Sequence, residues 1–167
     1  YDQIYDEHIF IFSVSAIKKI ARIFDFELID AIEQTTHGGS MRYVVARKNI
    51  FPVSKNVNFF LDKEKKLGFD TIEGCKKFKE NCELSKINLQ NKIRKIKDNN
   101  KNIAGYAATS KSTTILNYCN IGVESIDCIY DTTKEKIGKF SPGKHIPIIS
   151  YEKFIKNYPD YVYLFAW

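Results

Sequence analysis

The sequence of 167 residues has little of what marks a metal-binding, secreted or membrane-spanning protein. Its four cysteines lie 7, 37 and 9 residues apart and form no C-x-x-C pair, and only three histidines accompany them. We therefore expect no zinc site inside the chain. The start lacks a signal-peptide pattern, so we expect free thiols in a cytoplasmic protein. The longest apolar runs, such as residues 146–149, are too short for a membrane-spanning helix.

The sequence does have enough apolar residues to form a core, 44% of the total, and it carries a net charge of +6. The apolar share excludes a disordered chain. The surplus charge lies in residues 51–101, which carry 13 basic and 7 acidic side chains. Because this stretch is a Lys- and Asn-rich helical run without base-reading elements, a solvated surface is favoured over nucleic-acid binding.

The residues at both ends of the chain lead us to expect that it is an excerpt of a longer protein. The chain opens with Tyr1-Asp2-Gln3 without an initiator Met and stops in an aromatic-rich strand pattern, residues 162–167. A native terminus is normally polar and frayed.

The first half of the chain predicts a helix, two antiparallel strands and two further helices. Ser13 or Ser15 is expected to cap a helix that runs to about Phe24. Strands follow at 26–33 and 41–46, then helices at 55–67, ended by Gly68, and at about 71–97. One predicted buried face of the first helix comprises Ile17, Ile20, Ala21 and Phe24. The predicted buried face of the last helix comprises Cys75, Phe78, Cys82, Leu89, Ile93 and Ile96.

After residue 101 the pattern alternates between strands and helices. A strand at 103–106 leads into a helix at about 113–119, and a strand at 126–130 stops at Asp131. A glycine- and proline-containing loop, a helix near 151–156 and a last strand follow. This alternation predicts an α/β fold with a small Rossmann-like parallel sheet.

Three segments carry candidate chemistry. In Tyr5-Asp6-Glu7-His8, a histidine beside a carboxylate suits proton abstraction near neutral pH, although a solvated loop would have the same spacing. The paired glycines of residues 36–40 either bring backbone N–H groups to a ligand or simply close a hairpin. In residues 103–117, a loop with Lys111 and Ser112 at a helix N-terminus favours an anion over a purely structural turn.

Asp131 adds to the third segment, since it ends the next strand where a Rossmann acidic residue meets a ribose hydroxyl. The segment is not a P-loop, because Lys111 follows Gly105 without the G-x-x-x-x-G-K-[ST] pattern. It is also a poor match to G-x-G-x-x-G, because Ala107 stands where the second glycine would be.

Taken together, these residues resemble the S-adenosylmethionine-dependent sugar C-methyltransferases of deoxysugar biosynthesis, whose type activity is 3-C-methylation of dTDP-4-keto sugars. The matching segments fall in the family's order across nearly the whole chain. They are residues 1–8, 36–42, 105–112, 117–122, 142–148 and 159–167.

The resemblance implies a three-part parent with an N-terminal zinc module, a central methyltransferase domain and a C-terminal Rossmann-like domain. Residues 1–50 would be the tail of the central domain, with its closing helix and antiparallel strands. Residues 51–101 would be a helical connector and 102–167 the truncated nucleotide-sugar-binding domain. Zinc and most of the S-adenosylmethionine site would lie upstream, so the excerpt alone should be inactive. Ala107 and Ser112 replace glycines that are frequent in the family.

The resemblance also implies roles for residues. His8 would be the base that removes a proton beside a ketone, with Tyr5 and Glu7 orienting it or binding the sugar. The implied substrate-binding residues are His37, Lys111, Ser112, Thr113, Asn117, Asp131 and His145. The expected partners are a nucleotide-linked keto-deoxysugar and the rest of the parent chain, with no nucleic acid, no membrane and no metal bound by these residues. The alternative hypothesis is a non-catalytic nucleotide- or nucleotide-sugar-binding domain.

Overall fold

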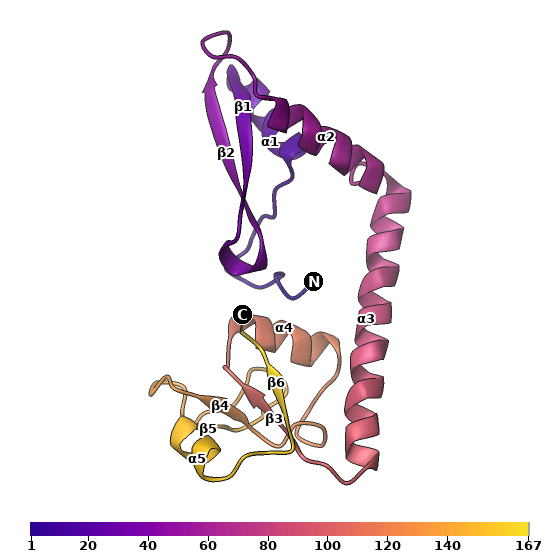
Figure 1. Cartoon of the computed structure of the whole chain (residues 1–167), viewed down its shortest axis with the longest axis vertical. Coiled ribbons are helices and arrows are strands. Elements are labelled where there is room, and N and C mark those ends of the chain that lie inside the picture. The colour runs from indigo at the N-terminus through magenta and orange to yellow at the C-terminus, as the bar shows by residue number, and fades with distance from the viewer. Residues whose placement is uncertain (167) are drawn as a thin grey trace. The chain divides into compact units, whose positions relative to one another are not determined.

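The computed structural model describes residues 1–166, except for the side chain of His37, and has the predicted α/β fold (Figure 1). The elements in chain order are α1 (Val14–Ile23), β1 (Phe26–Gln34), the 3₁₀ turn η1 (Thr36–Gly38), β2 (Ser40–Arg47), α2 (Lys55–Leu67), α3 (Ile72–Asp98), β3 (Ile103–Tyr106), α4 (Ser110–Tyr118), β4 (Ile129–Asp131), β5 (Ile148–Ser150), α5 (Tyr151–Lys156) and β6 (Tyr161–Leu164).

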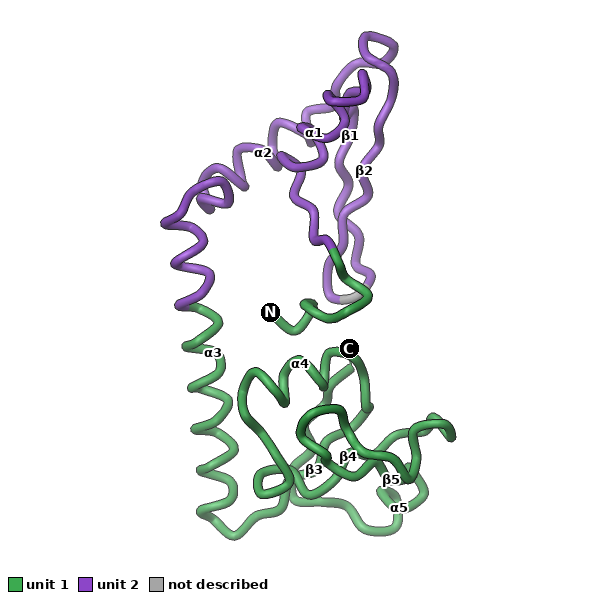
Figure 2. The backbone as a smooth tube through the Cα atoms, turned by 180° about the vertical axis from the view of Figure 1, so that it is seen from behind, with its two compact units in different colours: residues 1–9, 81–167 green, residues 10–80 purple. Residues whose placement is uncertain are grey.

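Packing divides the chain into two compact units, coloured separately in Figure 2. One unit is Phe10–Glu80. The other joins Tyr1–Ile9 to the residues from Asn81 onward, so the N-terminal loop belongs with the C-terminal sheet. The boundaries expected near residues 50 and 101 concern the parts of a longer protein, and they stay a prediction.

The unit of residues 10–80 is a hairpin covered by two helices. Ser13 caps α1 by accepting a hydrogen bond from the Ala16 amide at 3.1 Å, and Gly68 ends α2 with a left-handed backbone. β1 and β2 pair antiparallel, as predicted. The core of this unit consists of Val14, Leu28, Ala31, Val57 and Phe60.

Two of the predicted buried faces are only partly correct. In α1, Val14 and Ala21 are buried, whereas Phe24 is 67% exposed and Ile20 is also exposed. The inward line of this helix runs through the packed positions 14 and 17 and the buried position 21, so residues 20 and 24 lie to one side of it. In α3, Cys82 and Ile93 are buried but Cys75 and Phe78 are exposed. The expectation that Cys75 is a core residue is wrong, because the buried face of α3 begins only at Cys82.

Four parallel strands form the sheet of the other unit (Figure 1). Their spatial order is β5-β4-β3-β6, which is 3-2-1-4 when the four strands are counted along the chain. This is the strand order of the Rossmann fold. The order reverses between β3 and β6, and ligands of such folds bind beside the carboxyl ends of the strands at this switch point.

Two local boundaries in this sheet differ from the sequence prediction. The second strand is Ile129–Asp131 and not 126–130, because Ile126 lies in a buried turn before the strand. The helix after β3 begins at Ser110, three residues before the predicted start, because the Thr109 side chain caps it.

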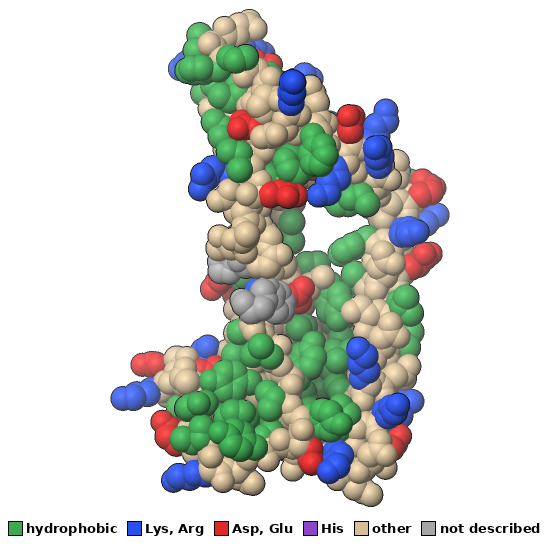
Figure 3. Space-filling model, viewed as in Figure 1, with side chains coloured by type: hydrophobic (Ala, Val, Ile, Leu, Met, Phe, Trp, Pro, Cys, Tyr) green, Lys and Arg blue, Asp and Glu red, His purple; other side chains and the backbone are tan. Residues whose placement is uncertain are grey.

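Helices cover both faces of the sheet. α3 and α4 bury a core on one face that includes Ile93, Leu116 and the fully buried Phe165, with the partly buried Leu89 packed against it. On the other face, the Phe154 ring of α5 lies 5.6 Å from the Tyr106 ring and 5.1 Å from the Tyr130 ring. On the side seen in Figure 3, basic side chains on α2 and α3 are interspersed with acidic and uncharged ones. The solvated surface expected for these helices stays a prediction.

Candidate functional site

The N-terminal loop, residues 1–9, holds the His8 imidazole between two hydrogen-bond partners. Nδ1 lies 2.8 Å from the Gln3 carbonyl oxygen, and Nε2 lies 3.1 Å from the Tyr5 hydroxyl. The Tyr5 ring also packs against the imidazole, with 4.1 Å between the ring centroids. Both side chains are half-buried, whereas the Glu7 side chain beside them is exposed.

These contacts fix the tautomer of neutral His8. A carbonyl oxygen can only accept, so Nδ1 carries the proton and donates it to Gln3. Nε2 is then an acceptor with its lone pair directed at the Tyr5 hydroxyl. An imidazole held in this way presents a basic nitrogen at a defined position, as a general base requires. The Gln3 carbonyl belongs to the backbone and leaves no side-chain pattern in the sequence from which its role could be read.

The loop after β3 lies at the switch point of the sheet. Ala107 adopts a left-handed backbone (φ +71), the conformation in which glycine is favoured. Thr109 then caps α4, accepting from the Ser112 amide at 3.1 Å, and its hydroxyl lies 3.4 Å from the Phe165 carbonyl oxygen after β6. The N-terminus of α4 therefore lies beside the carboxyl ends of both β3 and β6.

The residues predicted to bind a phosphate occupy the first turn of α4. Lys111 and Ser112 are buried, and the Ser112 hydroxyl donates to the Thr109 carbonyl oxygen at 2.6 Å. Thr113 is half-buried. The positive end of the helix dipole at this turn attracts negative charge.

Asp131 ends β4 as predicted, and its buried carboxylate holds the loop after β3. Oδ2 accepts from the Ala108 amide and Oδ1 from the Thr133 amide, both at 2.7 Å. Burial raises the Asp131 pKa, but these hydrogen bonds and the charge of Lys136 outweigh that effect and leave the pKa below its usual value.

Lys136, which the sequence reasoning did not single out, completes this arrangement. Its ammonium donates to the Ala108 carbonyl oxygen at 2.8 Å and lies 3.8 Å from Asp131 Oδ2. Both polar groups of Ala108 are thus bound, one by Asp131 and one by Lys136. The sequence signal that could have identified Lys136 is a lysine in the loop that follows the acidic residue at the end of β4.

The remaining predicted site residues lie in three places. Asn117 on α4 donates to the carbonyl oxygens of Thr113 (2.8 Å) and Pro142 (3.0 Å), which ties the 142–144 loop to the helix. His145 is exposed and follows that loop with a left-handed backbone (φ +52). His37 lies in the η1 turn between β1 and β2, and its side chain is outside the described part of the structure. Binding roles for all of these residues stay predictions.

The described residues do not provide a metal site. No group of three or more His, Cys, Asp or Glu side chains there is placed to hold a metal ion. Cys82 and Cys119 are buried core residues, and the described thiols are all unpaired. They do not fit a zinc centre, which takes several converging thiolate or imidazole ligands. Among the same residues, no helix is both long and apolar enough to span a membrane.

Comparison with known proteins identifies a matching family and a related protein. Residues 35–167 match the family described as the C-methyltransferase C-terminal domain. The chain is also 29% identical over 168 residues to the C-methyltransferase NovU of Streptomyces niveus, a match that covers all of this chain and 40% of that protein. The chain therefore belongs to the C-methyltransferase family, as the resemblance had implied.

Proposed function

We propose that this chain is part of an S-adenosylmethionine-dependent C-methyltransferase, which methylates a carbon beside the keto group of a nucleotide-linked deoxysugar. The observation that carries the proposal is the His8 imidazole, with its Nδ1 proton held by the Gln3 carbonyl and its Nε2 lone pair at the Tyr5 hydroxyl. Family membership supports the reaction class.

In the proposed reaction, His8 Nε2 accepts the proton of the carbon next to the ketone. The C–H electron pair forms a carbon–carbon double bond, and the carbonyl π pair moves to oxygen, which gives an enolate. The Tyr5 hydroxyl moves from Nε2 to the substrate as the imidazole becomes protonated on both nitrogens. The Gln3 carbonyl keeps its hydrogen bond throughout and stabilises the imidazolium. The exposed Glu7 carboxylate binds sugar hydroxyls.

The methyl donor supplies an electrophilic methyl group when it is bound. The paired glycines of this chain, Gly38 and Gly39, lie in the turn between β1 and β2 and form no donor loop after a parallel strand. We therefore assign most of the donor site to other parts of a longer protein. We also assign no zinc to these residues, because their cysteines do not converge.

The nucleotide diphosphate is proposed to bind at the N-terminus of α4. Lys111 and Thr113 would face its charge, and Asp131 and Lys136 would keep the loop in place. Asn117 and His145 would line the nucleotide side of the site, and His37 would contact the sugar. The proposed setting is the cytoplasm, where sugar nucleotides are made.

The test is the His8→Asn variant in the full-length protein that contains this chain. Methyl transfer should fall by at least a thousandfold, while the affinity for the nucleotide sugar stays within threefold of the wild type. Unchanged turnover would remove His8 from the role of base. The matched variant Tyr5→Phe should retain measurable turnover, since it keeps the imidazole and its Gln3 hydrogen bond.

A second candidate function is a nucleotide-sugar-binding module without methylation. The Rossmann strand order and the loop at the switch point support this alternative as well as they support the methyltransferase, because nucleotide binding does not need a catalytic base. Binding of the sugar nucleotide to a full-length protein that transfers no methyl group would support this alternative.

A further inference from the structure

The N-terminal loop is joined internally by hydrogen bonds. Two consecutive turns form it, closed by the Ile4 amide to the Tyr1 carbonyl (3.0 Å) and by the His8 amide to the Tyr5 carbonyl (2.9 Å). The bond from the His8 ring back to the Gln3 carbonyl joins the two turns. Any group that holds one of these turns therefore also positions the imidazole.

One anchor of this loop is Thr114, in the second turn of α4. Its hydroxyl donates to the Ile4 carbonyl oxygen at 2.9 Å. The hydroxyl has a single proton, and its alternative acceptor, the Ser110 carbonyl oxygen, lies farther away at 3.5 Å. The bond to Ile4 is thus the favoured one.

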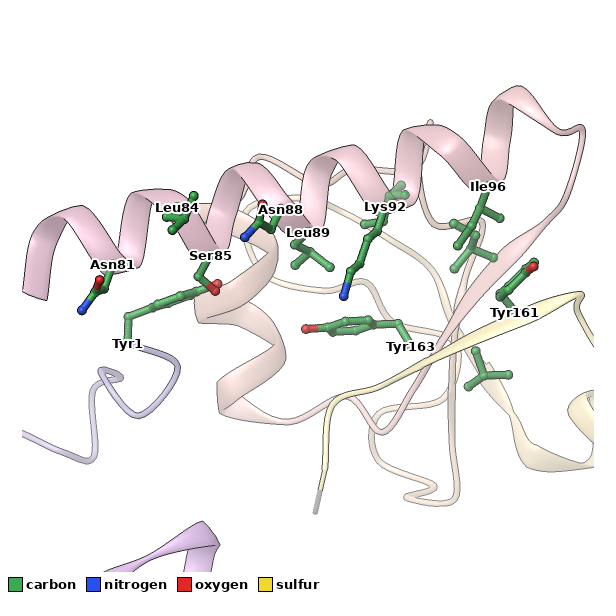
Figure 4. Close-up of a pocket in the computed structure, with 13 residues that line it drawn as sticks. Tyr1, Asn81, Leu84, Ser85, Asn88, Leu89, Lys92, Ile96, Tyr161 and Tyr163 are labelled. Carbon is green, nitrogen blue, oxygen red and sulfur yellow. The ribbon is translucent and has the colours of Figure 1, made fainter.

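The other anchor is Tyr1. Its ring packs on the Tyr118 ring of α4, with 4.7 Å between centroids, and its hydroxyl lies 3.4 Å from the buried Cys119 sulfur. Figure 4 shows the same phenol beside Ser85 of α3, at one end of a groove of about 640 Å³ between α3 and β6. The Tyr1 hydroxyl is protonated at neutral pH like any tyrosine, and burial raises its pKa further.

We infer that α4 couples the two parts of the proposed site, which are the His8 loop and the nucleotide-binding N-terminus of α4. Thr114 is the residue of α4 that positions His8. The first turn of α4 carries Lys111, and Thr114 follows it by three residues on the same side of the helix. A substrate held at the helix N-terminus is thereby set in a fixed relation to the base. The inference rests on the proposed function, since it takes His8 as the base.

The inference predicts that removal of the Thr114 hydroxyl frees the N-terminal loop from its fixed position on α4, while α4 itself stays folded. Valine has nearly the same shape as threonine but cannot donate to Ile4. In the full-length protein, Thr114→Val should lower kcat for methyl transfer about tenfold, the factor that corresponds to 1.4 kcal/mol. The KM for the methyl donor should stay within twofold. The rate at which the substrate carbon exchanges its hydrogen with solvent deuterium, without donor, should fall by the same factor as kcat.

The matched control is Thr114→Ser, which keeps the hydroxyl and should restore kcat and exchange to within threefold of the wild type. Equal losses in the serine and valine variants, or kcat and exchange unchanged in Thr114→Val, would overturn the coupling. If the valine variant does not fold, Tyr1→Phe tests the second anchor by the same two rates, and unchanged rates would again overturn it. Retained activity in His8→Asn would instead refute the proposed base, whatever Thr114 does.

Discussion

Gly105 in the central strand β3 offers the sharpest test of the packing described above. A Cβ at this position would lie 2.6 Å from Phe165 Cε2 and 3.1 Å from Ile129 Cγ1. Ordinary carbon contacts lie at about 3.5–4.0 Å, so the Phe165 ring would have to move by about 1 Å. Both side chains are fully buried, so neither can move aside into solvent.

We therefore predict that Gly105→Ala lowers the free energy of unfolding by about 2 kcal/mol, within the range known for overpacked cores. The melting temperature of the chain, followed by far-UV circular dichroism, should fall by about 4–8 °C. Combining the change with Phe165→Leu should recover part of the loss, because the smaller side chain vacates the space. A Gly105→Ala variant as stable as the wild type would refute this account of the glycine.

Two further predictions concern the loop after β3. Ala107→Gly should raise the free energy of unfolding by about 0.5–1 kcal/mol in chemical denaturation, because relief of the left-handed alanine exceeds the added flexibility of glycine; a loss of stability would contradict the left-handed backbone there. The melting temperature of Asp131→Asn should be lower than that of the wild type at pH 7, and the difference should shrink near pH 3. The pKa of Asp131 is lowered by folding, so its contribution is full above the unfolded value of about 3.9 and disappears as pH falls through the folded pKa. A difference that stays constant between pH 7 and pH 3 would show that the charge of Asp131 is not involved.

The parts of the fold that the sequence predicted are those with local signals. Ser13 at a helix start and Gly68 at a helix end are such signals, and the structure confirms both. The sequence pattern starts the strand around Ile129 too early, because Ile126 is equally apolar and equally buried although it lies before the strand, where its amide closes a turn. Burial of Cys75 was wrongly expected, since periodicity cannot say where along a helix its partner begins.

The candidate site divides in the same way. Tyr5, Glu7 and His8 stand together in the sequence, so their pattern could be recognised. The partners that orient them could not, because the Gln3 carbonyl is backbone and Thr114 is 110 residues from Ile4. Gly105 also has a different meaning in the structure. In the sequence it falls in the segment compared with glycine-rich ligand loops, whereas in the structure a Cβ there would meet the side chains of Phe165 and Ile129.

The most direct test of the central claim is hydrogen exchange at the substrate carbon beside the ketone. The full-length protein, given the nucleotide-linked keto sugar in deuterated water without a methyl donor, should introduce deuterium at that carbon. The His8→Asn variant should bind the same sugar and introduce none above the uncatalysed rate. Deuterium incorporation at the wild-type rate in His8→Asn would contradict the claim that His8 is the base.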